Sequence, residues 1–190
     1  MTLQPRHTDD HIYSHWKRQP IRDIYNWRVH ERDTGFANDG MTDFMTPEQR
    51  SRAMSKVRRR DTGAEIRLRS LLHRQGFRFR KNVRQLPGSP DIVLPKFKAV
   101  IFVHGCFWHG HIGCVRSRLP TSRAEFWQSK REANLERDER KIADLLVLGW
   151  RAAVVWECAL LNAETTSSVV AELAHWIRSQ SLRLEVPVAG

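Results

Sequence analysis

Residues 91–104 read DIVLPKFKAVIFVH, and this stretch decides the fold. Two β-branched runs, Asp91–Leu94 and Ala99–Val103, are separated by Pro95 and a short polar turn. Apolar runs of this length between turn residues are typical of strands, and the unbroken second run is typical of a strand buried on both faces. The stretch therefore predicts two neighbouring strands, the second fully buried.

Helix signals lie on both sides of these strands. Thr62-Gly63-Ala64-Glu65 and Ser122-Arg123-Ala124-Glu125 have the form of capping boxes, so each predicts the start of a helix. The first helix should end at Gly76, and the second, which is long and amphipathic, should end at Gly149. Three more elements are expected: strands at 77–80 and 151–157 and a last helix at 167–179. This order predicts an α/β fold with a mixed sheet flanked by helices, the layout of the restriction-endonuclease-like nucleases.

Basic residues are concentrated in the middle of the chain. The 190 residues carry a formal charge of +11, but residues 46–161 alone hold 24 Lys and Arg against 11 Asp and Glu. Residues 52–84 contain twelve Lys or Arg and only two acids. Such a density favours a polyanionic partner, with a merely solvated basic face as the alternative.

The two ends differ from this basic middle. Residues 1–45 show no sustained helical or strand period and predict a poorly ordered extension, followed by a domain at 46–180 and a C-terminal tail at 181–190. No apolar stretch approaches the roughly 20 residues that cross a bilayer, and no secretory signal begins the sequence. We therefore expect a cytoplasmic protein whose three cysteines stay as thiols, available for burial or metal binding.

The candidate catalytic groups lie on and after the two central strands. Asp91 opens the first strand, where a carboxylate can hold a hard divalent cation, although an aspartate there can also simply cap a turn. Many nucleases of this fold carry an acid-x-Lys pair on the next strand, whereas this chain has Phe102-Val103-His104. His104 and His109 are then the groups available for proton transfer, and the Val103 carbonyl is a candidate metal ligand. A structural or metal-binding role is the alternative for each histidine.

The loop at 103–114, VHGCFWHGHIGC, carries metal-ligand spacing. Cys106, His111 and Cys114 form a C-x4-H-x2-C pattern, and Cys158 follows the strand predicted at 151–157. This is the count and type of ligands in a structural Cys3His zinc site. Three buried free cysteines are the alternative, but that interpretation does not explain why two of them flank histidines in a Gly-rich loop.

Large aromatic residues accompany this loop. Phe107 and Trp108 lie inside it, and Trp127 lies early in the long helix. Packing onto the domain is the ordinary role of such residues. For Phe107 and Trp108 the basic surroundings instead favour a wedge that stacks against bases, and Trp127 is a candidate to join them.

Several stretches together resemble the very short patch repair (Vsr) mismatch endonucleases of bacteria. The similarity covers about residues 46–161 and is carried by MTPEQRSRAMSKVRRRDTGAEIRLRSLL, LPGSPDIVLP, FVHGCFWHGHIGC, RAEFWQSKREANLERDERK and GWRAAVVWECAL. The resemblance implies an enzyme that nicks one strand of duplex DNA on the 5′ side of the thymine in a T:G mismatch, the lesion left when 5-methylcytosine deaminates. It implies Mg2+ as the catalytic ion and Zn2+ as a structural one.

The resemblance also implies roles for individual residues. Asp91 and the Val103 carbonyl would bind the Mg2+, and Val103 stands where family members often have threonine. His104 and His109 would be the active-site histidines, with His109 as general base. Asp138 would orient a histidine and the water network, and Glu65 would reach the metal through water.

The remaining implied roles concern zinc and DNA. The zinc ligands would be Cys106, His111, Cys114 and Cys158, with one more residue between His111 and Cys114 than in some members. The residues that insert beside the mismatch would be Phe107, Trp108, Trp127 and Met54. We expect a monomer that acts on mismatched double-stranded DNA, with a mismatch-repair mediator as a candidate protein partner and no membrane.

Two other functions remain open from the sequence. A restriction-type endonuclease would cut both strands of fully paired DNA. A zinc-stabilised DNA-binding module would bind without catalysis, and the missing acid-x-Lys pair favours this alternative.

Overall fold

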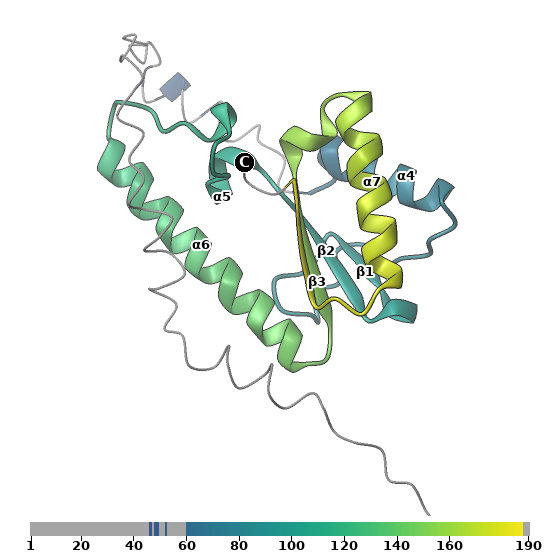
Figure 1. Ribbon diagram of the computed structural model, residues 1–190. Helices are drawn as coiled ribbons and strands as arrows, with labels where there is room; N and C mark the ends of the chain where they lie inside the picture. Colours follow the sequence, from purple (N-terminus) through teal and green to yellow (C-terminus); the bar gives the residue numbers. More distant parts are fainter. Residues whose placement is uncertain (1–45, 47, 50–51, 53–59, 188–190) are drawn as a thin grey trace, which may run out of the picture. The chain divides into compact units, whose positions relative to one another are not determined.

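A mixed four-stranded sheet lies at the centre of the fold (Figure 1). The computed structural model describes residues 46, 48–49, 52 and 60–187, all within the unit Thr42–Gly190. The strands pair in the order β1-β2-β3-β4, with β1 antiparallel to β2 and the other neighbours parallel. Their bounds are β1 Ile92–Leu94, β2 Ala99–His104, β3 Arg151–Trp156 and β4 Arg183–Val186.

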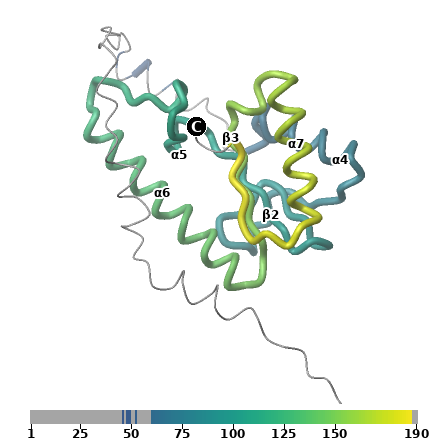
Figure 2. Tube along the Cα trace, in the orientation of Figure 1, coloured from purple at the N-terminus to yellow at the C-terminus, as the bar shows by residue number. Residues whose placement is uncertain are grey.

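Helices cover both faces of this sheet. α4 (Gly63–Arg74) and α7 (Ala163–Arg178) lie on one face and α6 (Ala124–Val147) on the other, as the chain trace also shows (Figure 2). Successive side chains of a strand point to opposite faces, so β2 contributes Ile101 to the α4–α7 core and Phe102 to the α6 core. The strands at 91–104 are thus buried on both sides, and the predicted α/β fold is confirmed.

Both helices begin where the two capping-box patterns predicted them, but only the first pattern forms a capping box. Thr62 and Glu65 form a true capping box at the start of α4, and Gly149, with φ +75°, follows the end of α6. Ser122 does not cap α6, because the N-cap is Arg123 in a left-handed conformation without a side-chain cap. α7 begins at Ala163, earlier than expected, because the Asn162 side chain accepts a hydrogen bond from the Thr165 N–H.

Two predictions, one of a strand and one of a C-terminal tail, need correction. The strand expected at 77–80 is reduced to a single bridge between Arg80 and Val93, and Phe77 is instead buried edge-on against Phe97 with ring centroids 5.8 Å apart. Residues 183–186, part of the segment expected to be a tail, form β4 at the sheet edge beside β3.

Two further predictions concern the N-terminal part of the chain and the membrane. The extension expected at 1–45 and the residue Met54 lie outside the described residues. In the part that the structure describes, no helix combines the length and apolar character needed to span a membrane.

Candidate active site and metal-binding cluster

The ends of two parallel strands bring the candidate site residues together. His104 ends β2 and is the register partner of Trp156, which ends β3. Cys106 begins the short helix α5 (Cys106–His109) two residues after His104, and Cys158 lies in the 3-10 turn η3 (Glu157–Leu160) two residues after Trp156. Because parallel strands end at the same edge of a sheet, this register places the two cysteines side by side.

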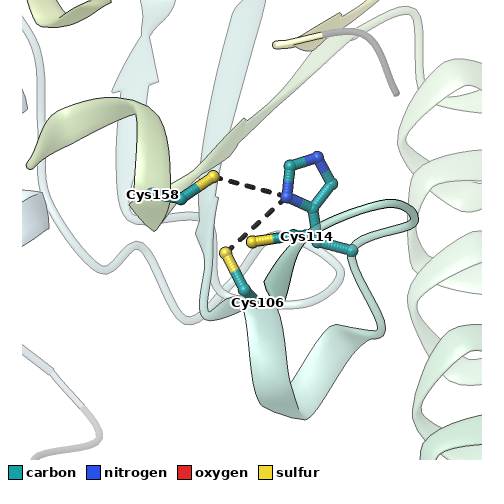
Figure 3. Close-up of side chains that lie close together, drawn as sticks. Cys106, Cys114 and Cys158 are labelled. Carbon is teal, nitrogen blue, oxygen red and sulfur yellow. Dashed lines mark hydrogen bonds between the residues drawn. The ribbon is translucent and has the colours of Figure 1, made fainter. Parts of the chain in front are cut away.

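The four predicted zinc ligands form one cluster (Figure 3). The ligand atoms of Cys106, His111, Cys114 and Cys158 all lie within 4.8 Å of one another. The Nδ1 atom of His111 is 3.4 Å from the Cys158 sulfur and 3.7 Å from the Cys106 sulfur. All three cysteines are free thiols. Three sulfurs and one imidazole nitrogen gathered in this way are a donor set that could hold zinc.

The pKa shifts in this cluster are also compatible with the binding of a metal cation. Burial raises the pKa of the Cys106 thiol to about 12 and also raises the pKa of Cys158. Burial lowers the pKa of His111, which leaves its ring neutral and able to offer a lone pair. A bound dication reverses the thiol shifts, since it stabilises the thiolates that burial disfavours.

The rings around His111 connect this cluster to β4. The His111 ring stacks on Trp156, with centroids 4.4 Å apart and planes at 11°. The indole N–H of Trp156 donates to the Glu185 carboxylate at 2.9 Å. β4 therefore supports the cluster as well as the sheet edge.

Contacts at the two ends of α5 fix the segment that follows β2. The Glu157 carboxylate accepts a hydrogen bond from the Cys106 N–H at 3.2 Å. Gly110 ends α5 with φ +66°, and a Cβ there would meet the Arg131 side chain at 2.7 Å. Both the backbone conformation and the close approach require glycine at this position.

A cavity of about 840 Å³ opens beside the cluster, lined by residues of α6, of the start of α4 and of the end of β2. All five predicted catalytic residues and the predicted metal ligand Val103 line it: Glu65, Asp91, Val103, His104, His109 and Asp138. Residues from the segment before β1, from the end of β2 and from the three helices α4, α5 and α6 thus meet in one cavity. A cavity in which several titratable groups with shifted pKa values converge is a usual setting of an active site.

Two histidines and one aspartate form the tightest group in this cavity. The Nδ1 atom of His109 lies 2.5 Å from Oδ2 of Asp138, and the His104 ring stacks on His109 with centroids 4.0 Å apart. Burial lowers the pKa of His104 to about 3, and the nearby His109 adds to the shift. Burial alone raises the pKa of Asp138, but the hydrogen bond and charge of His109 bring it below its usual value. His104 is therefore neutral and Asp138 ionised near pH 7.

Asp91 lines the same cavity and is oriented by the backbone. Its Oδ2 atom accepts a hydrogen bond from the Val103 N–H at 2.8 Å. Burial raises the pKa of Asp91 to about 6, and Glu65 adds to the rise despite the lowering effect of this hydrogen bond. A carboxylate in such an environment lacks compensating positive charge, which a divalent cation would supply.

Glu65 has a structural role in addition to lining the cavity. One carboxylate oxygen accepts from the N–H and the hydroxyl of Thr62, and the other accepts from the Asp61 N–H and from Arg69. Both oxygens are therefore engaged in starting α4. A link from Glu65 to a metal stays a prediction.

The aromatic residues gather at one side of the cavity. Phe107, Trp108 and Trp127 contact one another edge-to-face, with centroids 5.1 to 6.1 Å apart. The Trp108 carbonyl also accepts from the Asn134 side chain at 3.0 Å. All three rings are half-buried, so they keep exposed faces.

Sequence reasoning missed two kinds of residue here. Phe126 contacts Trp127 at 5.2 Å, is 46 % exposed and lines the cavity, and its place beside Trp127 in the sequence was the available signal. Lys130, Arg137 and Lys141 line the cavity from α6, although on a helix such residues look like an ordinary solvated face.

Comparisons with known proteins identify the family of this chain. The family described as DNA mismatch endonuclease Vsr matches residues 42–116. The chain is 42% identical to the DNA mismatch endonuclease Vsr of Escherichia coli K12 over 152 residues, which cover 79% of this chain and 97% of that protein. It is 54% identical to the type II nicking enzyme V.XorIIP of Xanthomonas oryzae pv. oryzae over 63% of this chain and 88% of that protein. It is 45% identical to the type II nicking enzyme V.NmeAIP of Neisseria meningitidis over 64% of this chain and 86% of that protein. The chain belongs to the Vsr family of DNA mismatch endonucleases.

Proposed function

We propose that this Vsr-family endonuclease hydrolyses one phosphodiester bond of duplex DNA on the 5′ side of the thymine in a T:G mismatch. The observation that carries the proposal is that one cavity holds Asp91, the histidine pair and Asp138, with aromatic rings in edge-to-face contact at its side. The family membership supports an enzyme that acts on DNA, and the names of two relatives describe them as nicking enzymes. The basic residues of α6 in the cavity suit a phosphate backbone.

His109 is the residue best placed to act as general base. Because its Nδ1 atom is engaged with ionised Asp138, the other ring nitrogen remains free to accept a proton from the attacking water. Asp138 holds the ring in this orientation and stabilises the imidazolium after proton transfer. His104, neutral and stacked on His109, restricts the movement of that ring.

Two metal ions are part of the proposal. Asp91 and the Val103 carbonyl would bind Mg2+, and the three thiols with His111 would bind Zn2+. When bound, the Mg2+ would stabilise the charge that develops on the phosphate and on the leaving 3′ oxygen. The Val103 N–H orients the Asp91 carboxylate for this purpose.

The aromatic group is proposed to recognise the mismatch. Phe107, Trp108, Trp127 and the newly found Phe126 would insert beside the mispaired step, where unstacking costs less than in paired DNA. Met54, outside the described residues, is proposed to enter from the minor groove. A monomeric state, a cytoplasmic location and stimulation by a mismatch-repair mediator stay predictions.

Nicking of end-labelled duplexes tests the proposed function. We expect a single cut in the thymine strand of a T:G duplex when Mg2+ is present, and none in the matching T:A and C:G duplexes. Mg2+ is best left out rather than removed with a chelator, because a chelator would also extract the zinc. Cutting of both strands of paired DNA would instead indicate a restriction-type enzyme, and binding without any cut would indicate a non-catalytic module.

Trp108→Ala is expected to lower kcat/KM on the T:G duplex by roughly 5- to 150-fold, because stacking on one base contributes about 1–3 kcal/mol. Zinc content should not change. The matched control is Val115→Ala, which removes an exposed side chain from the same loop outside the aromatic group. Equal activity of Trp108→Ala and the control would contradict the wedge.

A further inference from the structure

Lys141 reaches the candidate active site from α6 and contacts its central carboxylate. Its Nζ atom lies 3.4 Å from Oδ1 of Asp138, whereas the other oxygen, Oδ2, is the one that His109 contacts. The Asp138 side chain is only 12% exposed and the Lys141 side chain 31% exposed. The two oxygens of Asp138 are therefore anchored by different partners.

The aliphatic part of Lys141 is also fixed. A Cβ at Gly88 would lie 3.0 Å from the Lys141 Cδ and 3.0 Å from the Phe102 ring, so the backbone of this loop lies close to both side chains. Gly88 has φ +77° and belongs to the turn just before Asp91. The stem of Lys141 therefore lies close against the turn that leads to Asp91, which limits the rotamers open to it.

We propose that Lys141 is a positioning residue that holds the Asp138 carboxylate in the rotamer facing His109. A carboxylate with one free oxygen can rotate about its last bond, and a buried oxygen without a partner favours such rotation. With Lys141 on Oδ1, Oδ2 stays directed at His109, and the ring of the general base keeps its orientation. This inference rests on the proposed function, because it concerns the same site.

A direct contact between Lys141 and a DNA phosphate is the competing role, and a double-mutant cycle separates the two. The variants are Lys141→Met, Asp138→Asn and the combination of both, assayed for nicking of the T:G duplex. We expect Lys141→Met to lower kcat by about 10-fold with KM changed less than about twofold, as for coupled neighbours. In the Asp138→Asn background the same change should cause no further loss, because the lysine acts through Asp138.

Two controls accompany the cycle. Lys141→Arg keeps a cation near Oδ1 and should restore most of the lost kcat. Arg140→Gln removes one positive charge from the exposed neighbour on the same helix and should leave kcat unchanged. Independent losses that multiply in the double variant, a loss confined to KM, or an unchanged kcat in Lys141→Met would each overturn the inference.

A second readout does not depend on nicking. The hydrogen-bonded Nδ1 proton of His109 should give a downfield signal in proton NMR, which Asp138→Asn identifies by its loss. We expect this signal to be weakened in Lys141→Met and kept in Lys141→Arg. A wild-type protein that shows the signal but does not nick T:G DNA contradicts the proposed function alone, whereas an unaltered signal in Lys141→Met contradicts the role of Lys141.

Discussion

Asp91→Ala is expected to abolish nicking of T:G duplexes while leaving DNA binding intact. The substitution removes the cavity carboxylate that directly precedes β1, and with it the proposed Mg2+ ligand. A metal ion contributes several kcal/mol of transition-state stabilisation, so the loss in kcat should be at least about a thousand-fold. Binding should persist because basic side chains contact the phosphates. End-labelled nicking measures the first effect, and fluorescence anisotropy without Mg2+ measures the second.

Asp91→Asn tests the proposed metal-binding role of Asp91 with a smaller change in structure than Asp91→Ala. Its amide oxygen can still accept the hydrogen bond from the Val103 N–H, so the local structure is preserved while the charge is removed. The control Asp144→Asn makes the same chemical change at an exposed position of α6. Full activity of Asp91→Asn, or an equal loss in the control, would contradict the assignment.

The raised pKa of Asp91 gives this variant a second expected property. Burial raises the pKa of Asp91 to about 6 from 3.8, so the folded protein holds this proton more tightly than the unfolded chain. Ionised Asp91 therefore destabilises the metal-free fold above about pH 6, and the effect fades as the pH falls towards 4. Without added Mg2+, Asp91→Asn should be more stable than wild type at pH 7.5, by about 1–3 kcal/mol. Thermal unfolding at pH 7.5 and pH 5 measures the difference, which should shrink at the lower pH.

The sheet and the cysteine cluster could be predicted because their signals are local. The β-branched runs at 91–104 indicate buried strands whatever surrounds them, and the C-x4-H-x2-C spacing indicates a metal site by itself. Cys158 joined that prediction because it directly follows a strand, and the parallel register of β2 and β3 confirmed the placement. The restriction-endonuclease-like fold follows from the same elements.

Features that depend on tertiary contacts could not be predicted in this way. β4 is a short edge strand with alternating polar residues, and its pairing with β3 is what makes it a strand. Asp138 meets His109 across 29 residues, and on the sequence it is one charge among many on a helix. Only the family resemblance singled it out. Lys141, three residues further along, had no such signal.

Cys158→Ala is expected to reduce bound zinc strongly and to destabilise the whole fold. Cys158 follows β3, whereas the other three ligands belong to the segment after β2, so a zinc ion here would connect the two strand ends. A thousand-fold weaker zinc affinity corresponds to about 4 kcal/mol of folding free energy at a fixed zinc concentration. For a chain of this size, such a loss lowers Tm by roughly 8–16 °C. Elemental analysis gives the zinc content and calorimetry gives the Tm.

Two further variants, at Cys158 and at Glu157, show whether the effects of Cys158→Ala come from the lost zinc ligand or from altered packing. Cys158→His replaces the sulfur by another zinc ligand and should keep more zinc than Cys158→Ala. Glu157→Gln alters the adjacent residue but retains an oxygen for the Cys106 N–H, so zinc content should stay at the wild-type value. If Cys158→Ala bound one zinc per chain with an unchanged Tm, the cluster would not be a structural zinc site. The loop that carries His109 and Trp108 would then have to be held by its packing and its hydrogen bonds to Glu157 and Asn134.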